Sequence, residues 1–324
     1  MPNSILNSLL LKTLFLLLTF TYVLSAKEIT PLFRLHSVGF VSDFVVDGPY
    51  LYVANDRGSV DIFDLNTKAI VDQIILEPLT NLEGLLVPAA IHSVDRLHGK
   101  TLMVSSGVSG YRNVWIHEKG QLSQVVNETQ KLFIKEARFV GDERLMFGTF
   151  GSELILYDSV EAFPLYTAHI SQSTLGDFVL SASKEKMAMS DESGAITLVD
   201  VNTSEVEAVL ESQNVDNVYH IALEKDVIIT AGQDRRVGVY ASNRKAYYIK
   251  SDFLVYCVGL SPSAKIGIYS SGEDNNLQLF NVASKQKGDV LVGHKNIITQ
   301  IKFINEKQLF SSGRGNEILF WQLP

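Results

Sequence analysis

One pattern recurs with near-constant spacing along this chain of 324 residues. An apolar strand, a small polar turn and a second strand with a large apolar or aromatic end follow one another seven times. The closing residues are Phe63, Trp115, Tyr157, Val199, Tyr240, Phe280 and Trp321. They lie 52, 42, 42, 41, 40 and 41 positions apart. A period near 40 residues is typical of a four-stranded β-propeller blade, so seven repeats predict seven blades.

Within each repeat the apolar residues alternate with polar ones, as Val60 and Ile62 do. A helical repeat would instead place apolar residues every three or four positions. A further short strand precedes each repeat, and we interpret it as the innermost strand of the blade. The predicted fold class is therefore all-β: a seven-bladed β-propeller of a divergent WD-repeat type.

The two ends of the predicted propeller suggest how the ring closes. Pro324 directly follows the third strand of the seventh repeat, which leaves that blade without its outermost strand. Residues 29–36 read as a strand, and pairing with residues 318–323 would complete the blade and cover its edge. This reasoning predicts one domain over residues 27–324. The 52-residue interval places an insertion near residues 77–88.

The first 26 residues have the layout of a secretory signal peptide. Lys12 precedes the apolar run of residues 13–24, and Ser25 and Ala26 supply small residues for cleavage. An uncleaved N-terminal anchor is the alternative. There is no Arg-Arg pair before the run, and the single cysteine, Cys257, is too far away to carry a lipid at a new N-terminus. These features predict a soluble, Sec-exported, periplasmic protein with no stable membrane anchor.

Charge and cysteine content narrow the classes of partner. Cleavage after residue 26 removes one lysine, Lys12, and leaves 27 basic and 36 acidic residues, a net charge of −9. This charge argues against nucleic acid and anionic membranes as main partners. A single cysteine also means that no internal disulfide can form, so a large core must stabilise the fold.

The search for catalytic motifs finds none: G-x-S-x-G, GxGxxG, HExxH and C-x-x-C are all absent. The acidic run YSSGEDNNLQLF (residues 269–280) coincides with the turn of the sixth repeat, so it predicts a hairpin turn rather than a cation loop. We therefore predict no catalytic residue, no cofactor and no metal.

One polar set falls at equivalent places on the predicted inner strands: Asp43, Glu136, Asp177, His220, Cys257 and Gln300. Such a ring could bind a cation, or it could bond to turns and to neighbouring blades.

Two further residue patterns carry specific predictions. His294, a serine at 311 or 312, and Trp321 resemble the hydrogen-bonded histidine, serine and tryptophan of a WD-repeat blade, so we predict structural roles for His294 and Trp321. The segment from Asp200 to Ser204, DVNTS, predicts a glycosylation acceptor at Asn202, provided that the host glycosylates.

In a propeller, the turns between the second and third strands of each blade emerge on the same side as the loops that enter the inner strands. We predict that this side binds a protein partner. Its charged candidates are Arg57, Arg112, Asp191, Glu192, Arg235, Arg236, Glu273, Asp274 and Arg314. Arginine pairs with carboxylates and stacks on aromatic rings, and it is enriched at interfaces. The adjacent pair Arg235 and Arg236 is the favoured anchor, because neighbouring like charges gain nothing for folding.

Several segments together resemble the NapL family, the WD-repeat-like propeller accessory proteins encoded with the epsilonproteobacterial periplasmic nitrate reductase. They are VSDFVVDG, GSVDIFDL, SGYRNVWI, KEARFV, GTFGSE, MSDESGA, NVDNVY, AGQDRRVGVY, IKSDFLVYCVGLSPS and YSSGEDNNLQLF. The resemblance implies a non-catalytic role in nitrate respiration, with the reductase catalytic subunit or its maturation machinery as partner. We expect a monomer. The alternatives are a propeller enzyme of dehydrogenase or lactonase type and a periplasmic small-ligand sensor.

Overall fold

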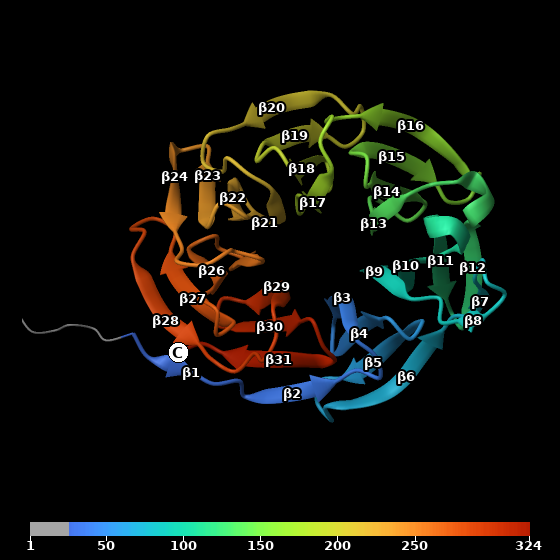
Figure 1. Ribbon diagram of the computed structural model, residues 1–324, viewed down its shortest axis with the longest axis horizontal. Coiled ribbons are helices and arrows are strands. Elements are labelled where there is room, and N and C mark those ends of the chain that lie inside the picture. The colour runs from blue at the N-terminus through green and yellow to red at the C-terminus, as the bar shows by residue number, and fades with distance from the viewer. Residues whose placement is uncertain (1–25) are drawn as a thin grey trace, which may run out of the picture.

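The computed structural model describes residues 26–324, which form seven β-sheets arranged as blades around a central channel (Figure 1). The predicted seven-bladed propeller is confirmed. The predicted signal peptide lies outside the described residues except for Ala26. Two short 3₁₀-helices, η1 (Val108–Gly110) and η2 (Glu128–Gln130), interrupt the strands. No helix within residues 26–324 is long and apolar enough to cross a membrane.

The first four blades each run from the channel outward in chain order. Blade one contains β3 (Val41–Asp47), β4 (Tyr50–Asn55), β5 (Ser59–Asp64) and β6 (Ala69–Ile75). Blade two contains β9 (Ile91–Leu97), β10 (Lys100–Ser106), β11 (Arg112–Glu118) and β12 (Gln121–Val126). Blade three contains β13 (Ile134–Phe139), β14 (Arg144–Thr149), β15 (Glu153–Asp158) and β16 (Phe163–His169). Blade four contains β17 (Leu175–Leu180), β18 (Lys186–Asp191), β19 (Ile196–Asp200) and β20 (Val206–Leu210).

The last three blades continue this order, and two of them take strands from the N-terminal segment. Blade five contains β21 (Val218–Glu224), β22 (Val227–Gly232), β23 (Arg236–Ala241) and β24 (Arg244–Lys250). Blade six contains β25 (Val258–Leu260), β26 (Ile266–Ser271), β27 (Asn276–Asn281), β28 (Lys287–Leu291) and β1 (Glu28–Ile29). Blade seven contains β29 (Ile298–Asn305), β30 (Gln308–Gly313), β31 (Glu317–Gln322) and β2 (Phe33–His36).

The core lies between adjacent blades. Leu102 and Val104 of blade two pack in one cluster with Ala137, Phe147 and Tyr157 of blade three. Each middle strand is covered on both faces by its neighbouring blades, so it is buried almost along its length, as β4 and β14 are. This explains why the second strand of each repeat reads as a nearly continuous apolar run.

The ring closes through the N-terminal segment, as the sequence predicts, but with two strands in place of one. Strand β2 pairs antiparallel with β31, with Phe33 opposite Phe320 and Leu35 opposite Ile318. Strand β1 pairs parallel with β28 of blade six, an addition that the sequence does not predict. Pro31 lies between the two strands and lacks an N–H donor, which explains the break in the predicted strand over residues 29–36.

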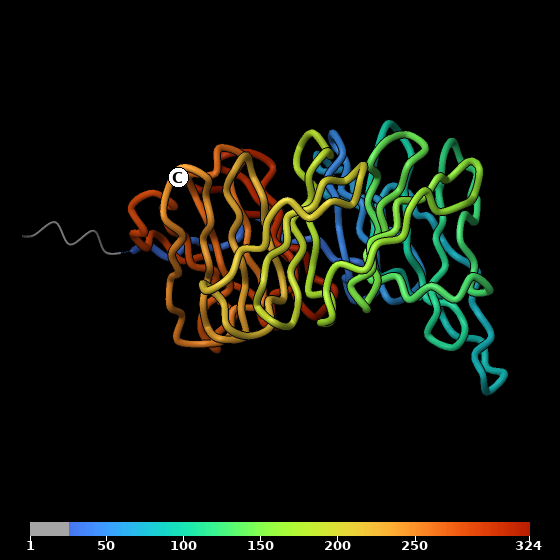
Figure 2. The backbone as a smooth tube through the Cα atoms, turned by 90° about the horizontal axis from the view of Figure 1, so that it is seen from above, coloured from blue at the N-terminus to red at the C-terminus, as the bar shows by residue number. Residues whose placement is uncertain are grey.

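The predicted insertion near residues 77–88 forms a small hairpin of β7 (Leu79–Thr80) and β8 (Leu86–Val87). The Asn81 side chain accepts hydrogen bonds from the N–H groups of Glu83 and Leu85, at 3.0 and 2.9 Å, and so orders the tip. The hairpin follows β6 and precedes β9, and it projects beyond the neighbouring loops in the side view (Figure 2).

Candidate interaction surface and central channel

The inner strands carry a β-bulge at the same place in six blades; in blade two the skipped residue is His92, between Ile91 and Ser93. The pairing with the second strand skips one residue between Val41 and Asp43, and again between Ile134 and Glu136. The same skip precedes Asp177, His220 and Gln300. The bulges therefore bring five members of the predicted polar set, all except Cys257, to equivalent positions around the channel, because a bulge re-aims the side chain beside it.

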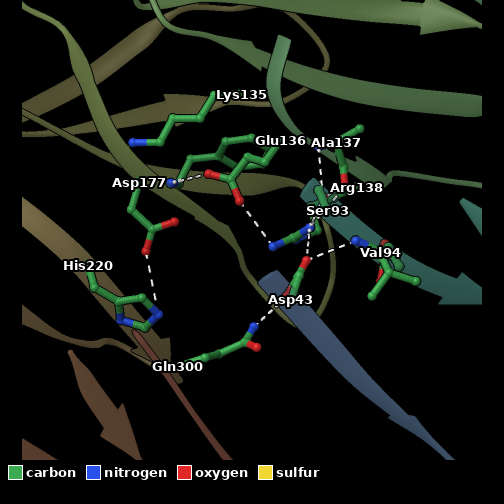
Figure 3. A network of polar contacts seen from close by, with 12 residues as sticks. Asp43, Ser93, Val94, Lys135, Glu136, Ala137, Arg138, Asp177, His220 and Gln300 are labelled. Atoms are coloured by element: carbon green, nitrogen blue, oxygen red, sulfur yellow. Dashed lines mark hydrogen bonds and ion pairs between the residues drawn. The ribbon is translucent and has the colours of Figure 1, made fainter. Parts of the chain in front are cut away.

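Most members of this polar ring bond to the neighbouring blade. In each case a side-chain oxygen accepts a hydrogen bond from a main-chain N–H of the next blade, as Figure 3 shows for Asp43 and Val94. The pairs are Gln300 Oε1 with Phe44 N (2.9 Å), Asp43 Oδ2 with Val94 N (2.9 Å), Glu136 Oε1 with Phe178 N (3.1 Å) and Asp177 Oδ2 with Ile221 N (2.9 Å). The second of the two predicted uses, bonding to neighbouring blades, is thus what the contacts show. These bonds fasten adjacent blades at the channel wall.

Arg138 of β13 connects two of these carboxylates and also binds Ser93 of blade two (Figure 3). Its guanidinium donates to Glu136 Oε2 at 3.0 Å, to Asp43 Oδ2 at 3.2 Å and to Ser93 Oγ at 2.7 Å. These carboxylates raise the pKa of Arg138, so it stays charged. The sequence analysis missed Arg138 because nothing in the sequence distinguishes it from other arginines on strands. Its proximity to Asp43 and Ser93 becomes visible only when the blades are assembled into a ring.

Burial changes the acidity of the channel groups. Burial and the nearby Asp177 carboxylate raise the pKa of Glu136 to about 8, although Arg138 opposes this. Burial also raises the pKa of Asp177. Burial lowers the pKa of His220 to about 4, so this side chain is neutral near pH 7. The His220 Nε2 atom lies 3.8 Å from Asp177 Oδ2.

The channel encloses a cavity of about 500 Å³ lined by residues of all inner strands. Cys257, predicted to belong to the polar ring, does not line this cavity: it is fully buried in the apolar core between blades six and seven. Burial raises the pKa of its thiol, so it is not activated as a nucleophile. Within residues 26–324, no group of three or more histidine, cysteine or acidic side chains is placed to hold a metal ion.

The residues of the WD-type pattern meet in blade seven. His294 Nε2 lies 2.6 Å from Ser311 Oγ, and Trp321 Nε1 donates to the same oxygen at 2.7 Å. Burial lowers the pKa of His294 to about 4. Blade two contains a related pair that the sequence analysis missed, in which Trp115 Nε1 donates to Ser105 Oγ at 2.9 Å. The sequence could have predicted this pair, because the serine precedes the tryptophan by ten residues in both blades.

We call one side of the ring the turn face: it carries the turns between second and third strands and the loops that enter the inner strands. Of the predicted charged candidates, Arg57, Glu192, Arg235, Glu273, Asp274 and Arg314 are exposed there. Asp191 is not available, because it is only 3% exposed and accepts hydrogen bonds from Ser171 and Ser193. The prediction of a partner-binding role was wrong for Asp191, whose carboxylate orders its own turn.

The assumption that Arg236 gains nothing for folding was also wrong. Its guanidinium lies over the Tyr248 ring, 4.4 Å from the centroid, and donates to the Gln213 carbonyl at 3.3 Å. Asp234 Oδ2 is 3.8 Å from its Nε. Arg235 remains exposed in the turn, with a φ of 62°. Within residues 26–324, the side chain of Arg235 therefore forms no hydrogen bond or ion pair, whereas that of Arg236 does.

The turn face also exposes large apolar side chains that the sequence analysis did not single out. They are Val38, Phe40, Leu82, Leu85, Leu86, Phe133, Phe150 and Val215. Leu82 and Leu86 of the β7–β8 hairpin are 79% and 74% exposed. The sequence did contain a signal for this exposure, namely the three leucines of the insertion NLEGLL. An insertion outside the repeat does not contribute to a blade core, so its leucines could have been predicted to be exposed.

The predicted glycosylation acceptor lies on the opposite face. Asn202 is exposed in the turn between β19 and β20, where Asp200 Oδ1 accepts from the N–H groups of Asn202 and Thr203 at 2.9 Å each. The Arg144 guanidinium donates to Asn202 Oδ1 at 3.1 Å. Asp200 thus has a local role in ordering this turn, whether or not the asparagine is modified.

The fold defines the class of this chain as a seven-bladed β-propeller. No model of a known protein family matches it. A stretch of 145 residues, 43% of the chain, is 23% identical to the E3 ubiquitin-protein ligase COP1 of Arabidopsis thaliana and spans 22% of that protein. The β-propeller domain of Cps50 (Swd1) from Myceliophteria thermophila aligns with a TM-score of 0.72 at 13% identity, covering 91% of the chain and 99% of that domain. Likeness at this identity shows the fold alone.

Proposed function

We propose that this chain is a non-catalytic interaction scaffold that binds a protein partner through its turn face. The observation that carries the proposal is the set of exposed apolar side chains on that face, led by Leu82, Leu85 and Leu86. These three leucines are 79%, 58% and 74% exposed within one short hairpin, and large exposed apolar side chains grouped in this way mark an interaction site more often than single ones do. Exposed arginines such as Arg57 and Arg314 lie on the same face, and arginine is enriched at interfaces.

A more specific form of the proposal names the cellular compartment and the partner. We propose a periplasmic accessory protein of the NapL kind that supports the maturation or operation of the periplasmic nitrate reductase. The signal-like residues 1–26 and the resemblance to the NapL family support this form. The net charge of −9 on residues 27–324 agrees with a protein partner better than with nucleic acid.

A pull-down tests both forms. Residues 27–324 are immobilised and the purified nitrate reductase catalytic subunit is applied. We expect capture by the wild-type chain and reduced capture by a variant with Leu82, Leu85 and Leu86 all changed to serine. The matched control is Val160→Ser, because Val160 is 65% exposed on the opposite face.

The possible outcomes distinguish the general proposal, binding through the turn face, from the specific proposal that the reductase is the partner. Absence of capture by the wild-type chain contradicts the reductase as direct partner. Equal capture by the triple variant and by Val160→Ser contradicts the β7–β8 hairpin as part of the interface. Both variants should melt like the wild-type chain, because exposed substitutions usually change stability by less than about 0.5 kcal/mol.

A further inference from the structure

Blades two and three meet on the turn face in a patch of three aromatic side chains and one arginine. The Tyr111 and Phe133 rings lie 4.7 Å apart between centroids, and the Arg112 guanidinium lies 5.8 Å from the Phe150 ring centroid. The Phe150 N–H donates to the Phe133 carbonyl at 3.0 Å, which joins the two loops. Phe133 and Phe150 are 48% and 40% exposed. We call these four residues the blade two–three patch.

The arginine of this patch has no acidic partner among residues 26–324. Its Nη1 donates to the Gly110 carbonyl at 2.8 Å, and its Nε is buried without any acceptor. Burial lowers the pKa of Arg112, and no carboxylate opposes that effect. A half-buried guanidinium without a carboxylate is costly, because the hydration lost at its Nε group is not replaced.

The other partly buried arginines of the fold are paired. Arg34 lies 3.0 Å from Glu317, Arg96 lies 2.8 Å from Asp47, and Arg138 bridges Asp43 and Glu136. Arg112 thus differs from the arginines that serve folding. Its surroundings, aromatic and exposed, are those in which an arginine acts as an interface anchor.

We propose that the blade two–three patch binds a partner protein segment in which an aspartate or glutamate adjoins a large apolar side chain. The carboxylate would accept from the Arg112 guanidinium, and the apolar neighbour would cover Phe133 and Phe150. The charge-assisted bond would form where the aromatic rings exclude water, which strengthens it. This inference rests on the proposed scaffold function and specifies the chemistry of its partner.

A selection with displayed peptides tests the patch without assuming a partner. Residues 27–324 are used to select from a random 12-residue peptide library, and the dissociation constants of enriched peptides are measured. We expect peptides with Asp or Glu beside Phe, Leu or Trp. Their binding should weaken about ten-fold or more in Arg112→Gln, as expected when a charged hydrogen-bond partner is removed. Phe150→Ala should also weaken binding, whereas Arg144→Gln, which changes an exposed arginine on the opposite face of blade three, should not.

Two results of the peptide selection overturn the patch. One is a selection whose enriched peptides bind Arg112→Gln and wild type equally, and the other is a selection that yields no Arg112-dependent peptide. Unchanged melting of Arg112→Gln and Phe150→Ala excludes misfolding as the cause of lost binding. Capture of the reductase by wild type and Arg112→Gln alike would keep the proposed function while contradicting the patch. Arg112-dependent peptides without reductase capture would keep the patch while contradicting that partner.

Discussion

Ser311 joins the two large polar side chains of the last blade. It accepts from Trp321 Nε1 and lies 2.6 Å from His294 Nε2, and Trp321 is fully buried. We predict that Ser311→Ala lowers the free energy of unfolding by about 2 kcal/mol or more, because a buried donor loses its partner. Chemical denaturation monitored by tryptophan fluorescence measures this.

The neighbouring residue supplies the control. Ser312 is equally buried, but its hydroxyl has no hydrogen-bond partner among residues 26–324. Ser312→Ala should therefore change stability little, since it deletes a hydroxyl that forms no bond. Equal losses for Ser311→Ala and Ser312→Ala would contradict the role given to the Ser311 hydroxyl.

Glu136 links residue chemistry to the pH dependence of stability. Its folded pKa is raised from 4.5 to about 8, so its protonated form is favoured in the folded state. Its contribution to stability is therefore complete below about pH 4.5 and is lost as the pH rises through about 8. We predict that the stability of Glu136→Gln, which mimics the protonated acid, improves relative to wild type as the pH rises from 5 to 8. Denaturation curves at pH 5, 6.5 and 8 measure this difference, and a constant difference would contradict it.

At this scale the sequence identified which residues share a position, but not always what they contact. Equivalent spacing in the repeats predicted that Asp43, Glu136 and Asp177 lie together. The burial of Asp191 and the stacking of Arg236 on Tyr248 could not be predicted, because the contacting groups come from other loops and strands. Whether a charged turn residue is exposed or paired depends on neighbouring side chains that only the folded structure brings close to it.

Among the elements, β2 determines whether the ring is closed. Leu35 is 2% exposed, the Phe33 ring stacks on Phe320 at 4.6 Å, and Arg34 pairs with Glu317. We predict that deleting residues 27–36 causes aggregation or a large loss of cooperative stability, because β31 becomes an exposed edge. The single substitution Leu35→Ala should cost about 2–5 kcal/mol, as for other buried leucines. Thermal and urea unfolding measure both effects.

Deleting only residues 27–29 is the graded control. It removes β1, which pairs with just two residues of β28, and leaves β2 in place. The loss should be much smaller than for the longer deletion. A chain starting at Ser37 that melts like residues 27–324 would contradict closure by β2.

The strands themselves were predictable because alternation of apolar and polar residues is a local property. The same holds for the completion of blade seven, since a missing fourth strand and a spare N-terminal strand are both visible in the sequence. Strand β1 was not predicted because two residues show no alternation, and its partner lies 262 residues away in blade six. The hairpin structure of the insertion likewise depends on the Asn81 side chain rather than on a repeat.

In the whole molecule, the contacts indicate which parts stabilise the ring and which part is free to bind a partner. The cores between blades and the hydrogen bonds around the channel stabilise the ring. Gly176 illustrates how closely adjacent blades approach, because a Cβ there would lie 2.0 Å from the Val218 carbonyl oxygen. The turn face takes less part in this packing and exposes the apolar residues and arginines described above. The central claim is that this face, and not the channel or the opposite face, binds the partner.

Hydrogen–deuterium exchange on residues 27–324, with and without the nitrate reductase catalytic subunit, tests that claim most directly. Saturating partner should slow amide exchange in the turn-face segments, above all residues 77–88, 107–112, 127–133 and 150–152. Turns of the opposite face, such as residues 48–50 and 200–205, should exchange at unchanged rates. Protection confined to the opposite face or to the outer strands would contradict the account.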